Sequence, residues 1–218
     1  MQPVAQLDAL IRSRHLLKHP FYQAWSHGDL PISTLQEYAG QYYHFESNFP
    51  RYVAGVYAKE TDPARRRILL ENLIDEEGRS PTHPELWSQF ATAIGAPDPA
   101  KEPHRAVQGT RGLLRTYEQF ALDGSLAGGL GALYAYESIF PEVAHEKARG
   151  LKAHYGISTR QALEFFTVHE EADQAHSAAE RELLSAELKG SPAAARAALF
   201  GAKRSLGAWW NFLDEFTP

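Results

Sequence analysis

Apolar positions recur every three or four residues along nearly the whole chain, which is the spacing of helices that each bury one face. No segment shows the alternation of a half-buried strand, and no unit of about 20 to 50 residues repeats. The pattern predicts an all-α protein, a single bundle of about seven to nine helical segments. The expected segments cover roughly residues 4–18, 21–27, 31–58, 62–78, 83–95, 105–122, 125–154, 158–188 and 191–216.

Residues that start, stop or bend helices set these boundaries. Gly28 is expected to end a helix in the left-handed conformation, and Asp62 before a proline is expected to cap the start of another. Ser33, three residues before a glutamine, reads as the first residue of a capping box. Pro50 and Pro141 fall inside long periodic stretches, where each is expected to bend one continuous helix.

Length and composition narrow the class of protein. The 218 residues suit one domain, residues 1–218, and the 44% hydrophobic and 22% charged residues are ordinary globular values. The 22 basic and 27 acidic residues give a net charge of −5, so we expect neither nucleic acid nor an anionic membrane as partner. There is neither a signal-peptide pattern nor an apolar run of about 18 residues, and the expected location is the cytoplasm.

The chain contains no cysteine. Disulfides, thiolate zinc sites, iron–sulfur clusters and cysteine nucleophiles are therefore excluded. Any metal ion must be bound by histidine and carboxylate side chains.

Three potential metal ligands share one face of a predicted helix. At 100° per residue, Asp173 lies about 40° from His169, and His176 lies about 20° from His169 on the other side. This narrow face also falls within the apolar stripe that should point inward. Ionisable groups buried without partners are costly, and binding a cation compensates for that cost. A pairing of these histidines with the aspartate, or a solvated face, would explain the pattern equally well for one helix taken alone.

Further candidate ligands occur on other predicted helices. Glu137 interrupts an apolar seam, and either Glu76 or Glu77 fits the inward face of its helix. His83 lies at a helix start, within reach if the preceding turn folds back. Each acid alone would more often be a surface residue. Three histidines and three carboxylates on several helices, however, form a set suited to two iron or manganese ions.

The pattern formed by these residues resembles the ligand signature of the heme-oxygenase-like diiron oxidases, which share the TenA/PqqC-like fold. Within that superfamily it most resembles the CADD-like branch, whose members act in para-aminobenzoate synthesis for folate. The resemblance extends from the segment His19–Tyr22 to the last ligand. It implies an oxygen-activating enzyme with an Fe/Fe or Mn/Fe centre that needs dioxygen and an external reductant. The metal ligands that it implies are Glu76, in preference to Glu77, with His83, Glu137, His169, Asp173 and His176.

The same resemblance gives Tyr22 and Lys147 catalytic roles. Tyr22 would be a sacrificial residue whose ring leaves as the aminobenzoate skeleton, and Lys147 would donate the amino group. Such an enzyme turns over about once. From spacing alone, each residue would more often be structural: Tyr22 an aromatic core residue and Lys147 a surface lysine. Other aromatic residues expected near the site could relay electrons, line a pocket or pack in the core: Tyr42, Tyr43, Tyr134 and Tyr136.

Two alternatives to this interpretation remain open. A diiron oxidase of the same superfamily could use the same ligands on an external amino acid or fatty acid, by N-oxygenation or C–C cleavage. A non-enzymatic interaction protein could carry the metal for stability and present the aromatic cluster around Trp209 and Trp210 to a partner, although this cluster could also close the bundle. We expect a homodimer, and the identity of the electron donor is open.

Overall fold

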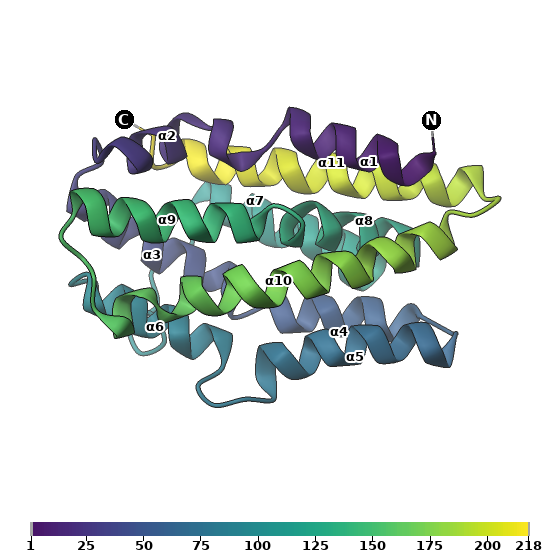
Figure 1. The fold of residues 1–218 in the computed structure, drawn as a ribbon, viewed down its shortest axis with the longest axis horizontal. Helices are drawn as coiled ribbons and strands as arrows, with labels where there is room; N and C mark the ends of the chain where they lie inside the picture. Colours follow the sequence, from purple (N-terminus) through teal and green to yellow (C-terminus); the bar gives the residue numbers. More distant parts are fainter. Residues whose placement is uncertain (1, 218) are drawn as a thin grey trace.

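The computed structural model describes residues 2–217, apart from the side chains at positions 171 and 172. Within that range the protein is helical and contains no strand, which confirms the all-α prediction. Figure 1 shows the helices running roughly along one long axis. In chain order the elements are α1 (Pro3–Ser13), the short 3-10 helix η1 (Leu16–Lys18), α2 (Pro20–His27), α3 (Ile32–Glu46), α4 (Phe49–Lys59), α5 (Pro63–Glu77), α6 (His83–Ala93), α7 (Gln108–Tyr117), the π-helical segment η2 (Glu118–Asp123), α8 (Leu126–Glu137), α9 (Phe140–His154), α10 (Arg160–Glu187) and α11 (Pro192–Asp214).

Helix α8 forms the centre of the bundle. Every residue from Ala127 to Glu137 is buried, and α4, α9, α10 and α11 pack around the helix. Its composition explains the central position, because glycines and alanines allow neighbouring backbones to approach closely. A Cβ atom at Gly131 would fall inside van der Waals contact with the Ala198 backbone of α11, so this pair of helices meets backbone to backbone.

Several helix ends lie where the sequence predicts them. Gly28 ends α2 with φ 78°, in the left-handed region, and the Asp62 carboxylate accepts hydrogen bonds from two backbone N–H groups at the start of α5. The capping box expected at Ser33 is wrong. Helix α3 already begins at Ile32, after Pro31, and its start has no side-chain cap.

The two bends expected at prolines are breaks between separate helices. The segment expected at 31–58 consists of α3 and α4, and the one expected at 125–154 consists of α8 and α9. Pro50 and Pro141 each occupy the first turn of the second helix. A proline is tolerated there because its missing N–H would have no helical partner, so a short interruption is cheaper than a kink.

The carboxyl-terminal aromatic residues close the bundle. Trp209, Phe212 and Phe216 are buried, and Trp210 is half-buried. No helix within residues 2–217 is long and apolar enough to cross a membrane.

Candidate metal centre

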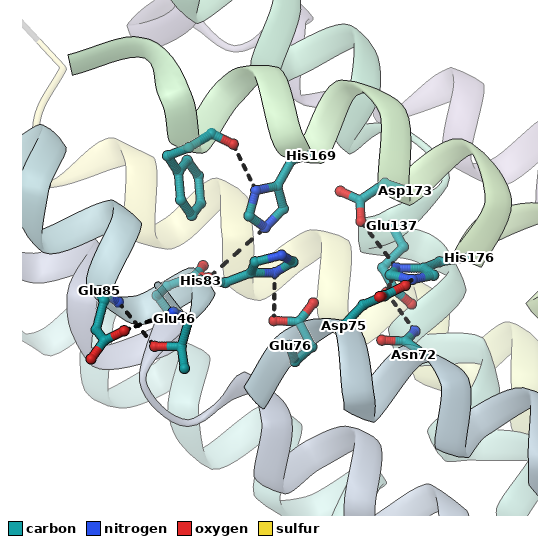
Figure 2. A network of polar contacts seen from close by, with 12 residues as sticks. Glu46, Asn72, Asp75, Glu76, His83, Glu85, Glu137, His169, Asp173 and His176 are labelled. Atoms are coloured by element: carbon teal, nitrogen blue, oxygen red, sulfur yellow. Dashed lines mark hydrogen bonds and ion pairs between the residues drawn. The ribbon is translucent and has the colours of Figure 1, made fainter. Parts of the chain in front are cut away.

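Buried acidic and imidazole side chains from five helices meet in the interior. They come from α3, α5, α6, α8 and α10, and Figure 2 shows most of them pointing toward one another. All six ligands expected from the sequence are among them and are buried: Glu76, His83, Glu137, His169, Asp173 and His176.

The potential ligand atoms form two groups that share one residue. In the first group, one atom from each of four side chains lies within 4.8 Å of the others; these are Glu46, Glu76, His83 and His169. The second group satisfies the same limit and consists of Glu76, Glu137 and His176. Because Glu76 belongs to both groups, its carboxylate lies where it could bridge two cations. Glu77 is exposed, so of the two neighbouring glutamates Glu76 is the one that faces the cluster.

Local structure explains how two of these side chains reach the interior. His83 is the first residue of α6, which a capping box of Thr82 and Glu85 starts, and its Nδ1 lies 2.9 Å from Glu76 Oε2. Glu137 is the last residue of the buried helix α8. The turn between α5 and α6 therefore folds back, as the sequence interpretation required.

Hydrogen bonds orient several of the candidate ligands. His169 Nδ1 donates to the Phe165 carbonyl oxygen at 2.8 Å, which leaves Nε2 for the site. Asn72 Nδ2 donates to Glu137 Oε1 at 2.8 Å, and His176 Nε2 lies 3.1 Å from Asp75 Oδ2. Such outer partners are typical of metal sites, where they fix ring and carboxylate orientation.

Asp173 lies outside both groups of ligand atoms. It occupies the same face of α10 as the two histidines, and its Oδ1 is 3.5 Å from His176 Nδ1. Its other oxygen is buried and makes no hydrogen bond among the described residues. The structure thus brings Asp173 to the edge of the cluster, beside its second half.

Burial and mutual repulsion perturb the acids of the cluster. Burial and the Glu76 carboxylate raise the pKa of Glu46 to about 8, and burial raises the pKa of Asp173 to about 7. Burial and the Glu137 charge raise the pKa of Glu76 well above its usual value. Burial lowers the pKa of His176, but the Asp173 carboxylate, 3.5 Å from Nδ1, and the Glu137 charge outweigh it and raise the value to about 10.

The other two histidines are held neutral. Burial lowers the pKa of His83, and burial together with His83 lowers the pKa of His169 well below the ordinary value. Neutral imidazole is the form that binds metal ions.

The donor set fits a pair of cations. Four buried atoms in the cluster make no hydrogen bond among the described residues: Glu46 Oε1, Glu137 Oε2, Asp173 Oδ2 and His176 Nδ1. Buried polar atoms of this kind are rare without a partner. Carboxylate oxygens and imidazole nitrogens from a helical bundle are the ligands that iron and manganese use in dimetal sites.

Sequence reasoning missed two buried acids of this region. Glu46 follows Tyr42 by four residues on the apolar seam of α3, the same signal that identified Glu137. Glu180 follows His169 by eleven residues, about 20° away on the same face of α10. Both are buried, and burial with the Glu137 charge raises the pKa of Glu180 well above its usual value. Extending each helical face by one further turn would have found them.

Tyr22 and Lys147 lie together beside this cluster. Lys147 is fully buried, and its Nζ makes no hydrogen bond among the described residues. The amine lies 4.7 Å from the ring centre of Tyr42, 5.1 Å from that of Tyr38 and 5.5 Å from that of Tyr22. Burial lowers its pKa well below 10.5, against the opposing charge of Glu46. The sequence alone did not distinguish this position from a surface lysine.

The other tyrosines named from the sequence have different surroundings. Tyr42 and Tyr136 are buried, and their hydroxyl groups are hydrogen-bonded to each other. Tyr134 donates to Asp8 at 2.8 Å, away from the cluster, and Tyr43 is half-buried. Tyr42 and Tyr136 are therefore the two that lie near the site.

Comparison with known proteins decides the family. Residues 36–210 match the family described as iron-containing redox enzymes. The chain belongs to this family. It is 41% identical over 211 residues to the 4-aminobenzoate synthase of Chlamydia pneumoniae, which covers 96% of this chain and 92% of that protein. It is 37% identical over 218 residues to the 4-aminobenzoate synthase of Nitrosomonas europaea, with 96% and 88% covered.

Comparison with a solved structure agrees with this result at the level of the fold. A domain from Shewanella denitrificans with a heme oxygenase-like fold superposes with a TM-score of 0.80 at 17% identity, covering 97% of this chain and 89% of that domain. These matches confirm the heme-oxygenase-like fold and the resemblance found in the sequence. As a member of the iron-containing redox enzymes, the chain is an enzyme of oxidative chemistry. Its buried cluster consists of histidines and carboxylates, which are side chains that bind iron.

Proposed function

We propose that this chain is a dimetal oxidase that forms 4-aminobenzoate from its own Tyr22, with Lys147 as the source of nitrogen. The observation that carries the proposal is the position of Lys147, an unpaired amine buried between the Tyr22 ring and the carboxylate cluster. Both relatives compared above are 4-aminobenzoate synthases.

Lys147 has the properties of a buried nucleophile. Burial in an apolar cage favours the neutral form of an amine, and only the neutral amine attacks carbon. The rings of Tyr38, Tyr42 and Trp87 surround Nζ at 4.7 to 5.2 Å and exclude water from it. The negative charge of Glu46 raises the pKa of Lys147 and so offsets part of the effect of burial.

Tyr22 is held as a protonated phenol within reach of this amine. Burial raises the pKa of Tyr22, and its hydroxyl group is hydrogen-bonded to that of Tyr38 at 3.1 Å. Edge contact with Phe21, at 5.2 Å between ring centres, fixes the ring further. The α2 helix thus places the ring in a pocket closed to solvent.

Comparing the tyrosine side chain with 4-aminobenzoate defines the bonds that change. The Cα–Cβ bond breaks, Cβ is oxidised to a carboxylate, and a nitrogen replaces the phenol oxygen on the opposite ring carbon. A buried amine beside the ring supplies the nitrogen: the bond between Nζ and Cε of the lysine breaks, and the phenol oxygen leaves as water. The oxidation requires dioxygen together with an external reductant.

The residues that would hold the metal are Glu76, His83, Glu137, His169, Asp173 and His176, in the arrangement described above. An Fe/Fe or Mn/Fe pair bound by them would supply oxygen activation. Glu76 shares both ligand groups, and Asn72 and Asp75 hold Glu137 and His176 in orientation.

The test is mass spectrometry of protein loaded anaerobically with iron or with iron and manganese, then given ascorbate and oxygen. Wild type is expected to lose the Tyr22 side chain and release about one 4-aminobenzoate per chain. Protein made with ¹⁵N-lysine should give ¹⁵N product. Tyr22→Phe and Lys147→Met should bind metal normally and release none.

Matched controls separate these roles from general damage. Tyr57→Phe on α4 and the exposed Lys152→Met on α9 should form product as wild type does. Product from Tyr22→Phe, or an intact Tyr22 in protein that has consumed oxygen, would overturn the sacrificial role. Unlabelled product from ¹⁵N-lysine protein would overturn the role of Lys147 alone.

A further inference from the structure

A basic groove runs along the surface between α7 and α11. It has a volume of about 800 Å³, and five cationic side chains line it: Arg14, Arg111, Arg115, Lys203 and Arg204. The one acid that lines it is Glu215, whose Oε1 accepts a hydrogen bond from the Gly109 N–H at 2.7 Å. The Glu215 carboxylate is thus directed toward the start of α7.

The cations of this groove lack acidic partners among the described residues. None of the five forms an ion pair with a described residue, whereas arginines elsewhere do so, such as Arg65 with Glu60 and Arg149 with Glu146. All five are exposed. The whole chain carries a net charge of −5, so this convergence of positive charge is a local feature that attracts anions.

Two glycines are among the residues that line the groove. Gly112 of α7 and Gly207 of α11 line it, and a Cβ atom at either position would meet no other atom within 4 Å. Both positions therefore face open space, and the small residues Ala208 and Thr116 also line the groove.

A line of aromatic rings leads from the groove to the metal centre. Trp209 follows Ala208 in the chain, and its indole N–H donates to the Tyr117 hydroxyl of α7 at 3.1 Å, so it joins the two helices on their buried side. Its ring stacks on Tyr136 with centres 5.0 Å apart and planes 7° apart. Tyr136 directly precedes Glu137 in the chain, and Phe140 connects Tyr136 to His169 at 4.9 and 5.3 Å.

We propose that this basic groove docks an acidic one-electron carrier protein of the ferredoxin or flavodoxin class, and that electrons enter through Trp209 and Tyr136. The proposal rests on the proposed function, which requires an external reductant. Each docked carrier is oxidised by one electron and leaves. Two such transfers would supply the two electrons that a pair of trivalent ions, held by the candidate ligands, needs to reach the divalent state.

The exposed cations favour a protein over a small anion. The charged groups come from the end of α1 and from the outer faces of α7 and α11, so they present a broad surface to solvent. Charge of this kind speeds the association of a complementary protein surface and is weakened by salt. The line of aromatic rings begins at Trp209, so a carrier protein docked above Trp209 would lie at the start of this line.

The test measures binding and electron transfer separately. A plant-type [2Fe–2S] ferredoxin is used as the acidic probe, with binding followed by calorimetry at low and high salt. The metal-loaded, oxidised protein then reoxidises reduced ferredoxin in a stopped-flow instrument. Arg111→Glu/Arg115→Glu is expected to weaken binding at least tenfold and to remove its salt dependence. Trp209→Phe should bind normally and slow ferredoxin oxidation at least tenfold.

The matched control is Arg67→Glu/Arg196→Glu, which makes the same charge change at exposed arginines outside the groove. Its binding should stay within twofold of wild type. Equal weakening in both double variants would overturn the docking site. The docking site would also be overturned if the wild-type protein bound pyrophosphate at these arginines but did not bind ferredoxin. A Trp209→Phe rate equal to wild type would overturn the electron route. Dithionite reduces all variants directly, so product formation with dithionite tests the proposed function independently of docking.

Discussion

Glu76 is the residue on which both halves of the candidate metal centre depend, because its carboxylate belongs to both ligand groups. Its neighbour Glu77, about 100° further around α5, is exposed. The two positions differ by one residue in the chain and share the same side chain, which makes them a matched pair for testing metal binding.

Glu76→Ala is expected to bind clearly fewer than two metal ions per chain, because it removes a ligand from each group. Glu77→Ala should bind as wild type does. Glu137→Ala and His176→Ala each remove a ligand from the second group only, and they should also bind fewer than two ions. Metal content after anaerobic loading and desalting, measured by inductively coupled plasma mass spectrometry, checks this. Two ions retained in all three buried variants would contradict the ligand assignment.

The sequence predicted most of this site but not all of it. His169, Asp173 and His176 could be placed on one face because helical geometry is regular over seven residues. The choice of Glu76 over Glu77 depended on resemblance, since periodicity near a helix end tolerates a shift of one residue. Glu46 was missed although it lies on a visible seam, because tyrosines and phenylalanines there suggested only core packing. The cage around Lys147 depends on contacts between distant helices, which spacing within one helix does not reveal.

At the scale of helices, starts and ends were easier to predict than whether a long stretch forms one continuous helix or two. Asp62 and Gly28 act through their own backbone neighbours, so their effect can be read locally. Pro50 and Pro141 could either bend a helix or begin a new one. The choice is made by tertiary packing, which places Ser138 and Ile139 between α8 and α9 and so lets Glu137 end its helix inside the metal centre.

The close contact of α8 with α11 gives a prediction about stability. Gly131→Ala should destabilise the protein by about 1 to 3 kcal/mol, because the added methyl group meets the Ala198 backbone, which cannot turn away as a side chain can. Gly207→Ala, on the open side of α11, should be neutral or stabilise by about 0.5 to 1 kcal/mol through its higher helix propensity. Urea unfolding of the metal-free proteins measures both; equal free energies of unfolding for the two variants would contradict the packing argument.

At the scale of the whole molecule, the metal-free protein carries several buried acids with raised pKa values. In the folded state Glu46 keeps its proton to about pH 8, and His176 keeps its proton to about pH 10. In the unfolded chain both have lost their protons by pH 7 to 8. Burial lowers the pKa of Lys147, so this residue loses its proton more readily in the folded state. Glu76 and Glu180 have raised pKa values and, like Glu46 and His176, hold protons more firmly in the folded state.

The folded metal-free protein therefore holds more protons than the unfolded chain, so its free energy of unfolding should fall from pH 7 to pH 9. The slope is about 1.4 kcal/mol per pH unit for each net proton. Bound metal ions neutralise the ionised carboxylates, so the fall should be much smaller with Mn²⁺ than with a chelator. Melting temperatures at both pH values, with and without Mn²⁺, give the comparison. A metal-free protein equally stable at pH 7 and pH 9 would contradict it.

The burial of Tyr22 has a consequence for the fate of the protein after the proposed reaction. The ring is enclosed by Phe21 and Tyr38, and its departure leaves a void the size of a phenol in a packed interior. Voids of this size cost about 3 to 5 kcal/mol, a large part of the 5 to 15 kcal/mol by which proteins are ordinarily stable. A spent chain would thus melt well below a fresh one, as calorimetry of the two would show, and would be degraded preferentially by proteases that act on unfolded chains. The proposed reaction would in this way lead to the degradation of each used molecule.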